Sequence, residues 1–323
     1  MRRTRLGVAM AMAGMAACTA ARADDFAPLT NAATLARFAP LPALGQPRAA
    51  APFVQLDAMA ANEFLYEGFD AAGTCIGECL LVDAETGIVA LRAAGPLGRS
   101  AEWRVELPWL SQGGGALDSS IETWHGWFGL PNASRERVAR DQFRLRYQRG
   151  AATPVDVVEP QHGLGDARVA LGWQAGDAVM LRAMGSLPTG DADALLGGQG
   201  GGAVWADAAL PLSGLWEGYL SGGAAYAVPG GALRDRQKRL IPFGGLGLRV
   251  ALGQSLSLHA QLQVHGALYG DSDLKALSGI GAPLSLGGRW RFSRGFAVDL
   301  SVLEDPGVGV SPDFAVQLVL TGG

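Results

Sequence analysis

The most regular pattern in the sequence is an alternation of apolar and polar residues with a period of two. It runs longest through residues 255–268, where leucine and valine occupy most even positions and serine, histidine and glutamine the odd ones. The same alternation recurs at 100–109, 140–149, 164–174, 282–292, 295–304 and 312–320. Successive side chains of a β-strand point to opposite faces, so the pattern predicts strands with one apolar and one polar face.

The spacing of the strands indicates how they are connected. We predict fourteen strands, at residues 53–67, 76–83, 86–94, 100–109, 140–149, 164–174, 177–187, 203–211, 215–227, 240–252, 255–268, 282–292, 295–304 and 312–320. From residue 164 onward, short turns such as 175–176 and 253–254 alternate with long loops such as 188–202 and 269–281. This rhythm is typical of outer-membrane proteins. The sequence therefore predicts an all-β fold: a transmembrane antiparallel up-and-down β-barrel of about 12–14 strands, spanning residues 53–323.

One insertion, at residues 110–139, interrupts the strand rhythm. An even number of strands places both ends of the barrel at the periplasmic rim. Because four of the fourteen predicted strands precede the insertion, it is expected on the periplasmic side. It contains a capping box, Ser119 to Glu122, and apolar residues at helical spacing, which together predict one short helix. We expect this helix to plug the periplasmic mouth, or to pack on the rim without a gating role. Its plug-helix residues are Leu117, Asp118, Ile121, Glu122, Trp124, His125 and Phe128.

The polar faces of the strands carry charges that lipid would not tolerate, because an arginine at the bilayer midplane costs roughly 2–4 kcal/mol. We therefore expect a charged lumen that either tunes the selectivity of a water-filled pore or cancels as a network of ion pairs. His259 and His265 lie six residues apart on one strand, too far apart to share a ligand. The lumen-lining candidates are Glu102, Arg104, Glu106, Arg144, Arg146, Arg168, Arg182, Arg249, His259, His265, Arg289, Arg291 and Asp299.

The N-terminal region has a different composition. Three arginines precede an apolar run over 6–17, and Ala21-Arg22-Ala23 provides a cleavage site, so residues 1–23 are predicted to be a secretory signal peptide. The alternative is lipoprotein processing at Cys18, which follows small residues. Residues 24–52 are rich in Ala, Pro and Leu without sustained periodicity, and we predict a flexible N-terminal tether there.

Composition excludes several classes of protein. The 323 residues include 47 glycines, about twice the usual frequency of roughly 7%, which argues against a helix-rich fold. The net charge of −4 is scattered, so no basic face is available for nucleic acid. Cys75 and Cys79 are spaced for a local disulfide in an oxidising compartment and make a poor zinc site.

Candidate chemistry is confined to the predicted helix. Asp118, Glu122 and His125 could bind a cation or pair an acid with a base, but no HExxH pattern is present. We predict no metal, no cofactor and no enzymatic activity. An outer-membrane lipid hydrolase using Ser119 or Ser120 with His125 and Asp118 remains the alternative, together with a purely structural barrel. A soluble periplasmic sandwich fits the loop rhythm poorly.

Several motifs carry a resemblance to a known family. They are Gly113–Glu122, Trp124–Pro131, Gly163-Leu164-Gly165-Asp166, Leu187-Pro188-Thr189-Gly190-Asp191 and Glu304-Asp305 with Ser311–Phe314. Together they resemble an uncharacterised bacterial family of the domain-of-unknown-function 3187 type, over residues 53–320. The resemblance implies an outer-membrane location and no reaction.

The GLGD and PTGD segments are also similar to outer-membrane transporters of aromatic or hydrophobic compounds. The chain ends Leu320-Thr321-Gly322-Gly323, where such barrels commonly end on a phenylalanine that the barrel-assembly machinery reads. The sequence thus predicts a channel or transporter for small, hydrophobic molecules in the outer membrane of a Gram-negative bacterium. Its expected partners are outer-membrane lipid, a small-molecule solute and the assembly machinery.

Overall fold

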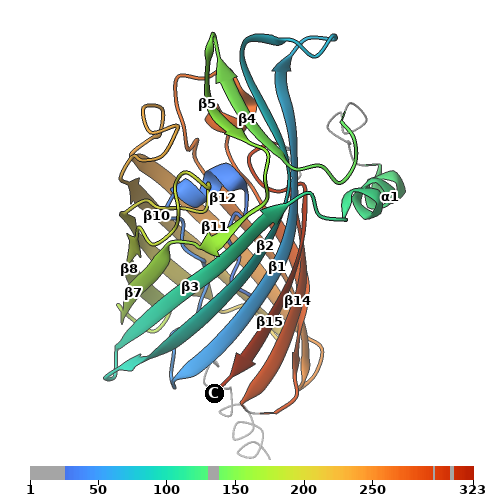
Figure 1. Cartoon of the computed structure of the whole chain (residues 1–323). Coiled ribbons are helices and arrows are strands. Elements are labelled where there is room, and N and C mark those ends of the chain that lie inside the picture. Colours follow the sequence, from blue (N-terminus) through green and yellow to red (C-terminus); the bar gives the residue numbers. More distant parts are fainter. Residues whose placement is uncertain (1–25, 130–137, 294, 306–308) are drawn as a thin grey trace, which may run out of the picture.

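The fold is a closed antiparallel β-barrel with a peptide segment inside it (Figure 1). The computed structural model describes residues 26–129, 138–293, 295–305 and 309–323, without the side chains of Ser120, Trp124, His125 and Phe128. Within these residues, fifteen strands share one sheet, and twelve of them form the barrel wall. The sheet closes because the last strand pairs with the first, Leu56 opposite Leu320.

The twelve wall strands follow the order of the sequence. They are β1 Phe53–Phe69, β2 Cys75–Leu97, β3 Ala101–Gly113, β7 Ala167–Gln174, β8 Val179–Leu187, β9 Gly201–Leu210, β10 Trp216–Ala227, β11 Leu240–Ala251, β12 Leu256–His265, β13 Leu284–Arg291, β14 Phe296–Glu304 and β15 Phe314–Gly322. Three short strands extend the sheet beyond the wall: β4 Arg144–Arg149, β5 Ala152–Val157 and β6 Gln161–Leu164. The helices are η1 Thr34–Phe38, α1 Asp118–Phe128 and α2 Lys275–Ser278.

The barrel class is confirmed, but the list of fourteen strands was wrong at two places. The predicted strands 76–83 and 86–94 are one long strand, β2. The predicted strand 140–149 is β4, which pairs with the outer end of β2, from Glu78 to Asp83, and is not itself a wall strand. Because β2 was predicted as two strands, the predicted direction of β3 across the membrane was reversed. The insertion after β3 therefore lies at the rim of the long loops, opposite the chain's C-terminus (Figure 1).

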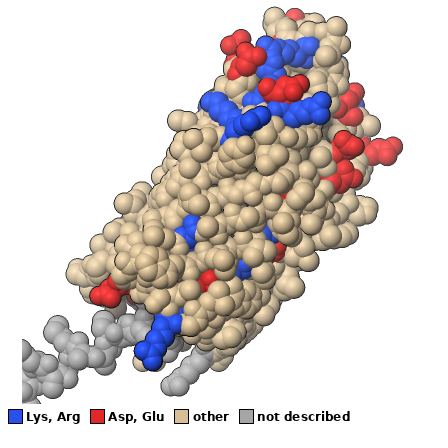
Figure 2. Space-filling view, turned by 90° about the vertical axis from the view of Figure 1, so that its left-hand side faces the viewer, with Lys and Arg blue, Asp and Glu red and all other residues tan. Residues whose placement is uncertain are grey.

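The two faces of the wall differ as the alternation predicts. On β12, Leu256 and Leu258 are 40% and 46% exposed, whereas the intervening Ser257 and His259 are buried on the inner side. Near the short-turn rim, the outward ring of Trp290 stacks on Phe292, and Phe296 lies tilted beside Phe292, like the aromatic girdle of a membrane barrel. Figure 2 shows one face of the wall, on which charges gather at one end and are sparse over the middle.

The N-terminal segment is the largest departure from expectation. We call residues 26–52 the plug segment, because nearly all residues from Phe26 to Ala49 are buried inside the barrel (Figure 1). The expected flexible tether is thus an ordered part of the core. Its weak periodicity has a physical cause: this chain is surrounded by wall on all sides, so no single face of it is selected to be polar.

The described loops add small elements at the long-loop rim. A disulfide joins Cys75 to Cys79 at the start of β2. No helix among the described residues is long and apolar enough to cross a membrane. The predicted signal peptide and the Cys18 alternative lie outside the described residues.

Candidate functional site

The lumen is the candidate functional site, and the plug segment passes through it twice. Ala27 and Pro28 contact the middle of β12 and β15 through their carbonyl oxygens. The segment then rises to η1 beneath the long loops, where the Tyr269 hydroxyl donates to the Leu35 carbonyl oxygen at 3.0 Å. From Ala39 it descends past β7, β12, β9, β8 and β3 and joins β1 at Phe53.

Side chains of the wall and its loops hold the plug segment mainly by its main chain. Within the described residues, eight plug carbonyl oxygens accept hydrogen bonds from wall or loop side chains. The donors, in the order of the plug carbonyls from Ala27 to Pro47, are Gln261, Gln317, Tyr269, Gln237, Arg168, Gln263, Arg182 and Arg104. A buried carbonyl without a donor would be costly, so these side chains make the buried plug tolerable.

Carboxylates on the wall bind amide groups of the same segment. Thr34 N–H donates to Glu63 at 2.8 Å, Gly45 N–H to Asp207 at 2.9 Å, and Ala49 N–H to Glu102 at 2.6 Å. Charge-assisted hydrogen bonds of this kind are roughly twice as strong as neutral ones. The wall thus supplies donors to carbonyls and acceptors to amides along both passes.

The charges on one side of the lumen form two groups of ion pairs. Glu102 lies between Arg104 at 2.9 Å and Arg182 at 2.8 Å, and Arg182 also pairs with Asp207. A second group joins the first strands: Arg92 contacts Asp57 and Glu106, and Arg168 lies 3.3 Å from Glu106. These four arginines face four carboxylates, so the charges cancel while the plug is in place.

The opposite side of the lumen has separate pairs. Arg289 donates two hydrogen bonds from Nε and Nη2 to Asp299, both residues being fully buried, and Arg249 pairs with Glu217. His259 lies 3.2 Å from the Ser301 hydroxyl, and the His265 ring lies 2.8 Å from the Asn31 amide of the plug segment. Arg291 lies half-buried at the short-turn end of β13.

Among the described residues, two of the cavities lie between the plug segment and the wall. The first, about 70 Å³, is lined by Pro42 and Ala43 of the plug and by Phe53, Met184 and Trp205 of the wall. The second, about 60 Å³, lies nearer the long loops, and Arg92, Glu106 and Arg168 line both. Each holds a few waters at most and is far below the roughly 300–1,000 Å³ of a drug-sized pocket.

The long loops close the upper end through two of the sequence motifs. Asp166 of GLGD accepts N–H groups from Gly190, Gly198 and Gln199, at 3.0, 2.7 and 3.1 Å. Thr189 of PTGD donates its hydroxyl to the Gly165 carbonyl oxygen at 2.6 Å. The two motifs therefore form one junction that folds the 188–200 loop inward over the plug.

Arg37 of η1 contacts this loop, and its Nη1 donates to the Leu195 carbonyl oxygen at 3.4 Å. Burial lowers the pKa of Arg37 to about 10, an effect that nearby Glu63 opposes. That pKa keeps Arg37 charged at neutral pH. The loop and the plug are thus joined by a cation that remains protonated.

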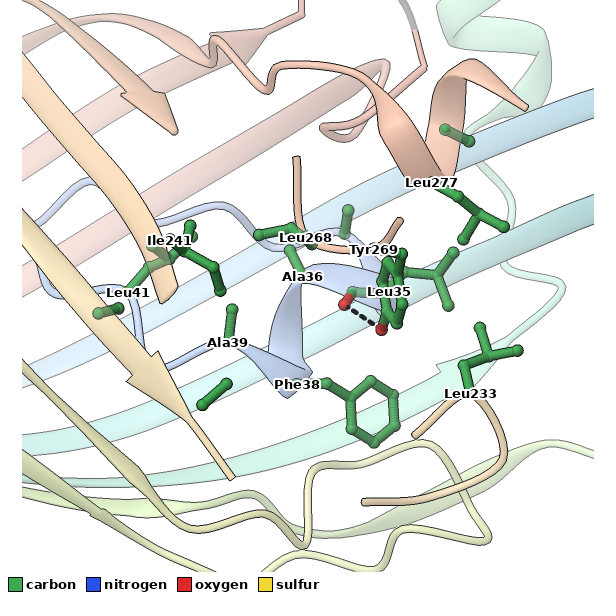
Figure 3. Close-up of a cluster of buried hydrophobic side chains, with 14 of the residues drawn as sticks. Leu35, Ala36, Phe38, Ala39, Leu41, Leu233, Ile241, Leu268, Tyr269 and Leu277 are labelled. Atoms are coloured by element: carbon green, nitrogen blue, oxygen red, sulfur yellow. Dashed lines mark hydrogen bonds between the residues drawn. The ribbon is translucent and has the colours of Figure 1, made fainter. Parts of the chain in front are cut away.

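Apolar packing also joins the plug segment to the loops. Figure 3 shows Leu35, Phe38 and Leu41 of the plug in one cluster with residues from the barrel and its loops. Their partners in that cluster include Leu233, Ile241, Leu268 and Leu277. Two long loops, β11 and α2 therefore contribute to the same core, and the plug is its centre.

The structure places two predicted lumen residues elsewhere. Arg144 and Arg146 belong to the β4–β5 hairpin beyond the rim, where Arg144 pairs with Asp156 and Arg146 donates to Gln148. They alternate like wall residues because the hairpin is itself a two-faced sheet. The other candidates, Glu102, Arg104, Glu106, Arg168, Arg182, Arg249, His259, His265, Arg289, Arg291 and Asp299, lie on inward positions of wall strands.

The expected plug helix lies outside the barrel (Figure 1). The buried carboxylate of Asp118 accepts from Asn62, on the outer face of β1, at 3.2 Å and from the amide of Asp141 at 2.8 Å. Ile121 is buried, and Glu122 pairs with Arg140. Leu117 donates its N–H to Glu85. Of the two expectations for the insertion, the structure fits the helix packed on the rim and not the plug, because α1 packs against the outer face of β1.

The alternative hydrolase set falls partly outside the described side chains, namely at Ser120 and His125, as do Trp124 and Phe128. Within the described residues, Asp118 holds α1 against β1 and Asp141 rather than facing the lumen. No group of three potential metal ligands occurs among these residues. The absence of enzymatic activity stays a prediction.

Sequence reasoning missed the plug segment, although a signal was present. Apolar residues recur at every third position from 26 to 44: Phe26, Leu29, Ala32, Leu35, Phe38, Leu41 and Leu44, all buried. A period of three matches polyproline II and 3₁₀ geometry rather than strands or α-helices. The inward residues Asp57, Arg92 and Asp207 were also missed, although each lies in an alternating stretch.

Comparisons with known proteins agree with the fold. Residues 5–323 match the model of a family described as "Protein of unknown function (DUF3187)", which confirms the resemblance seen in the motifs. No curated protein matches the chain.

Among solved structures, the COG4313 outer membrane channel from Pseudomonas putida F1 is similar, with 15% identity, a TM-score of 0.51 and coverage of 88% of this chain and 97% of that one. The translocator domain of the autotransporter NalP from Neisseria meningitidis has 11% identity, a TM-score of 0.49 and coverage of 85% and 89%. The P. putida toluene transporter TodX has 10% identity, a TM-score of 0.40 and coverage of 93% and 98%. The first similarity shows the outer-membrane barrel fold; the other two are weaker.

Proposed function

We propose that this chain, which belongs to the DUF3187 family of proteins of unknown function, is an outer-membrane channel closed by its own N-terminal segment. One observation carries the proposal: a polar wall encloses a segment of the chain that is bound to it along both passes. A barrel that only had to be stable could be filled by wall side chains, as in eight-stranded barrels. A separable peptide in a polar lumen is instead the arrangement of a closed pore.

The proposed passage requires the plug segment to move. The C-terminal end of the plug segment can move at the short-turn rim, because Ala50, Ala51 and Pro52 are exposed there. At the other rim, the GLGD–PTGD junction and the apolar cluster hold η1. We infer that opening starts with the descending pass, residues 39–52, which lies between the exposed linker and η1.

The proposal places the short-turn rim in the periplasm and the long loops outside the cell, with a signal peptide removed during export. The apolar outer surface and the stacked aromatic rings near the short-turn rim support membrane insertion. The solute is proposed to be small. Outer-membrane lipid and the assembly machinery remain proposed partners.

A liposome-swelling assay tests this function. A protease site is inserted between Ala50 and Ala51, the protein folds with its plug, and cleavage then frees the segment. We expect vesicles with cleaved protein to swell in small sugars and vesicles with uncleaved protein to remain tight. The matched control carries the same site in the exposed turn at Gly176–Asp177, so that cutting leaves the plug attached. Equal swelling before and after cleavage of the linker would refute the proposal.

A further inference from the structure

The descending pass of the plug segment is held differently from η1. Around η1, three plug side chains bond to the wall or its loops: Asn31, Thr34 and Arg37. Over residues 39–49, the described hydrogen bonds to the wall are made by main-chain groups, while the side chains of Leu41 and Leu44 pack in the apolar cluster. The plug groups in these hydrogen bonds are the carbonyl oxygens of Leu41, Pro42, Gln46 and Pro47 and the N–H groups of Gly45 and Ala49.

The hydrogen bonds of this segment depend little on the identity of the plug's side chains, whereas the positions of Leu41 and Leu44 also call for apolar residues. Every peptide has the same carbonyl and amide groups, so Arg104, Arg182, Gln263 and Glu102 would bind another extended chain in the same way. Pro42 and Pro47 lack an N–H and favour an extended backbone, which leaves their carbonyls available to the wall. The lower lumen is therefore complementary to an extended, proline-containing backbone.

The first cavity adds a side-chain pocket to this cradle. It has about 70 Å³ of free space beside Ala43, and Phe53, Met184 and Trp205 supply the apolar part of its lining. The charged residues Arg92, Arg104, Glu106 and Arg168 also line it. The resident alanine leaves that space unfilled. A peptide with a somewhat larger apolar residue at the same position would fill it and remove more apolar surface from water.

We propose that the lower lumen is a binding site for short extended peptides that take the place of residues 39–49. The solute class of the channel is then peptides with proline and small apolar residues. This inference rests on the proposed function, because the site is free only when the plug segment has left. It also differs from the hydrophobic solute expected from the sequence, since the site offers hydrogen-bond donors and acceptors along its length.

Fluorescence anisotropy of a labelled peptide tests the site without any need for conductance. The protein is the variant cleaved between Ala50 and Ala51, folded whole in detergent and then freed of its plug by washing. The probe is a free peptide of residues 39–49. A permuted peptide with the prolines and leucines kept in place should bind within tenfold of it, whereas polyethylene glycol of equal length should not compete. Replacing the residue equivalent to Ala43 by valine should tighten binding roughly tenfold.

Wall variants provide the matched controls. Gln263→Leu removes the donor to the Pro42 carbonyl and should weaken binding about fivefold. Ser285→Ala changes a buried lumen residue of β13 with no described bond to residues 39–49 and should leave binding unchanged. If the freed segment stays bound, the same measurements are made on a variant with residues 26–49 replaced by a Gly-Ser linker of equal length. Heat-dependent gel mobility first shows that this variant is folded.

The possible outcomes distinguish the proposed peptide-binding site from the proposed channel function. Binding of both peptides, weakened by Gln263→Leu, supports the peptide site even if cleaved protein does not make vesicles swell. Swelling without peptide binding refutes the site and keeps the channel. Competition by polyethylene glycol equal to that by peptide, or binding of the native peptide at least a hundredfold tighter than of the permuted one, also overturns the proposal.

Discussion

Asp166 provides the sharpest test of how the long loops cover the plug. Its carboxylate accepts three N–H groups of the 188–200 loop, from Gly190, Gly198 and Gln199. Asp166→Ala removes both acceptor oxygens and with them all three hydrogen bonds. The loop should then open locally, while the barrel wall, held by its own ladder of hydrogen bonds, remains closed.

The size of the effect follows from the number of bonds. A hydrogen bond to a charged group is worth about 1.5–3 kcal/mol, but amides freed in an open loop regain water, so the three losses do not add in full. The free energy that favours the closed over the open loop should fall by about 3 kcal/mol. Since about 1.4 kcal/mol corresponds to a factor of ten, amide exchange in the loop should accelerate roughly a hundredfold.

Hydrogen–deuterium exchange of peptides covering residues 188–200 measures this directly. Asp166→Asn keeps one acceptor oxygen and should give an intermediate rate. Asp177→Ala changes an exposed carboxylate in the short turn between β7 and β8 and should leave the loop protected. If Asp166→Ala exchanged as slowly as wild type at the Gly190, Gly198 and Gln199 amides, the GLGD–PTGD junction would not be what holds the loop.

Three further predictions follow from the wall. Arg182→Met leaves Glu102 and Asp207 without their shared cation and should lower the free energy of unfolding by about 3–5 kcal/mol in urea titrations from vesicles. Arg168 has an 18% exposed side chain and one 3.3 Å ion pair, so Arg168→Met should cost less than half of that. Equal losses would contradict the network. The unboiled protein should migrate differently from the boiled protein on a gel, as closed barrels do, and a single mobility would argue against closure. Purified protein should release no fatty acid from phospholipid vesicles, and release that His125→Ala abolishes would restore the hydrolase hypothesis.

The alternating strands were predictable because the two faces of a wall strand meet different surroundings. On β12, leucine lies on the outer face, while Ser257, His259 and Gln261 face the lumen. Whether a residue is apolar or polar therefore predicts which face of the wall it occupies. The same logic failed for the β4–β5 hairpin, which also has two faces but borders no lumen. Arg144 alternates as Arg168 does, and only the pairing of β4 with the outer end of β2 separates them.

The plug was predicted at the insertion rather than at the N-terminal segment for two physical reasons. The side of the insertion depends on strand parity, and one long strand counted as two reverses it. The plug segment has no period of two or 3.6, because its order comes from wall residues distant in sequence, such as Gln317 bound to Pro28. Its three-residue apolar repeat identifies it only once an extended, enclosed chain is considered.

Single-channel recording in a planar bilayer tests the central claim most directly. The variant with a protease site between Ala50 and Ala51 should show rare, small openings before cleavage and steady conductance after it. Adding free peptide of residues 24–52 should then close the open channels again. A conductance that cleavage does not change, or that the peptide does not reduce, would contradict the claim that the N-terminal segment is the gate of this barrel.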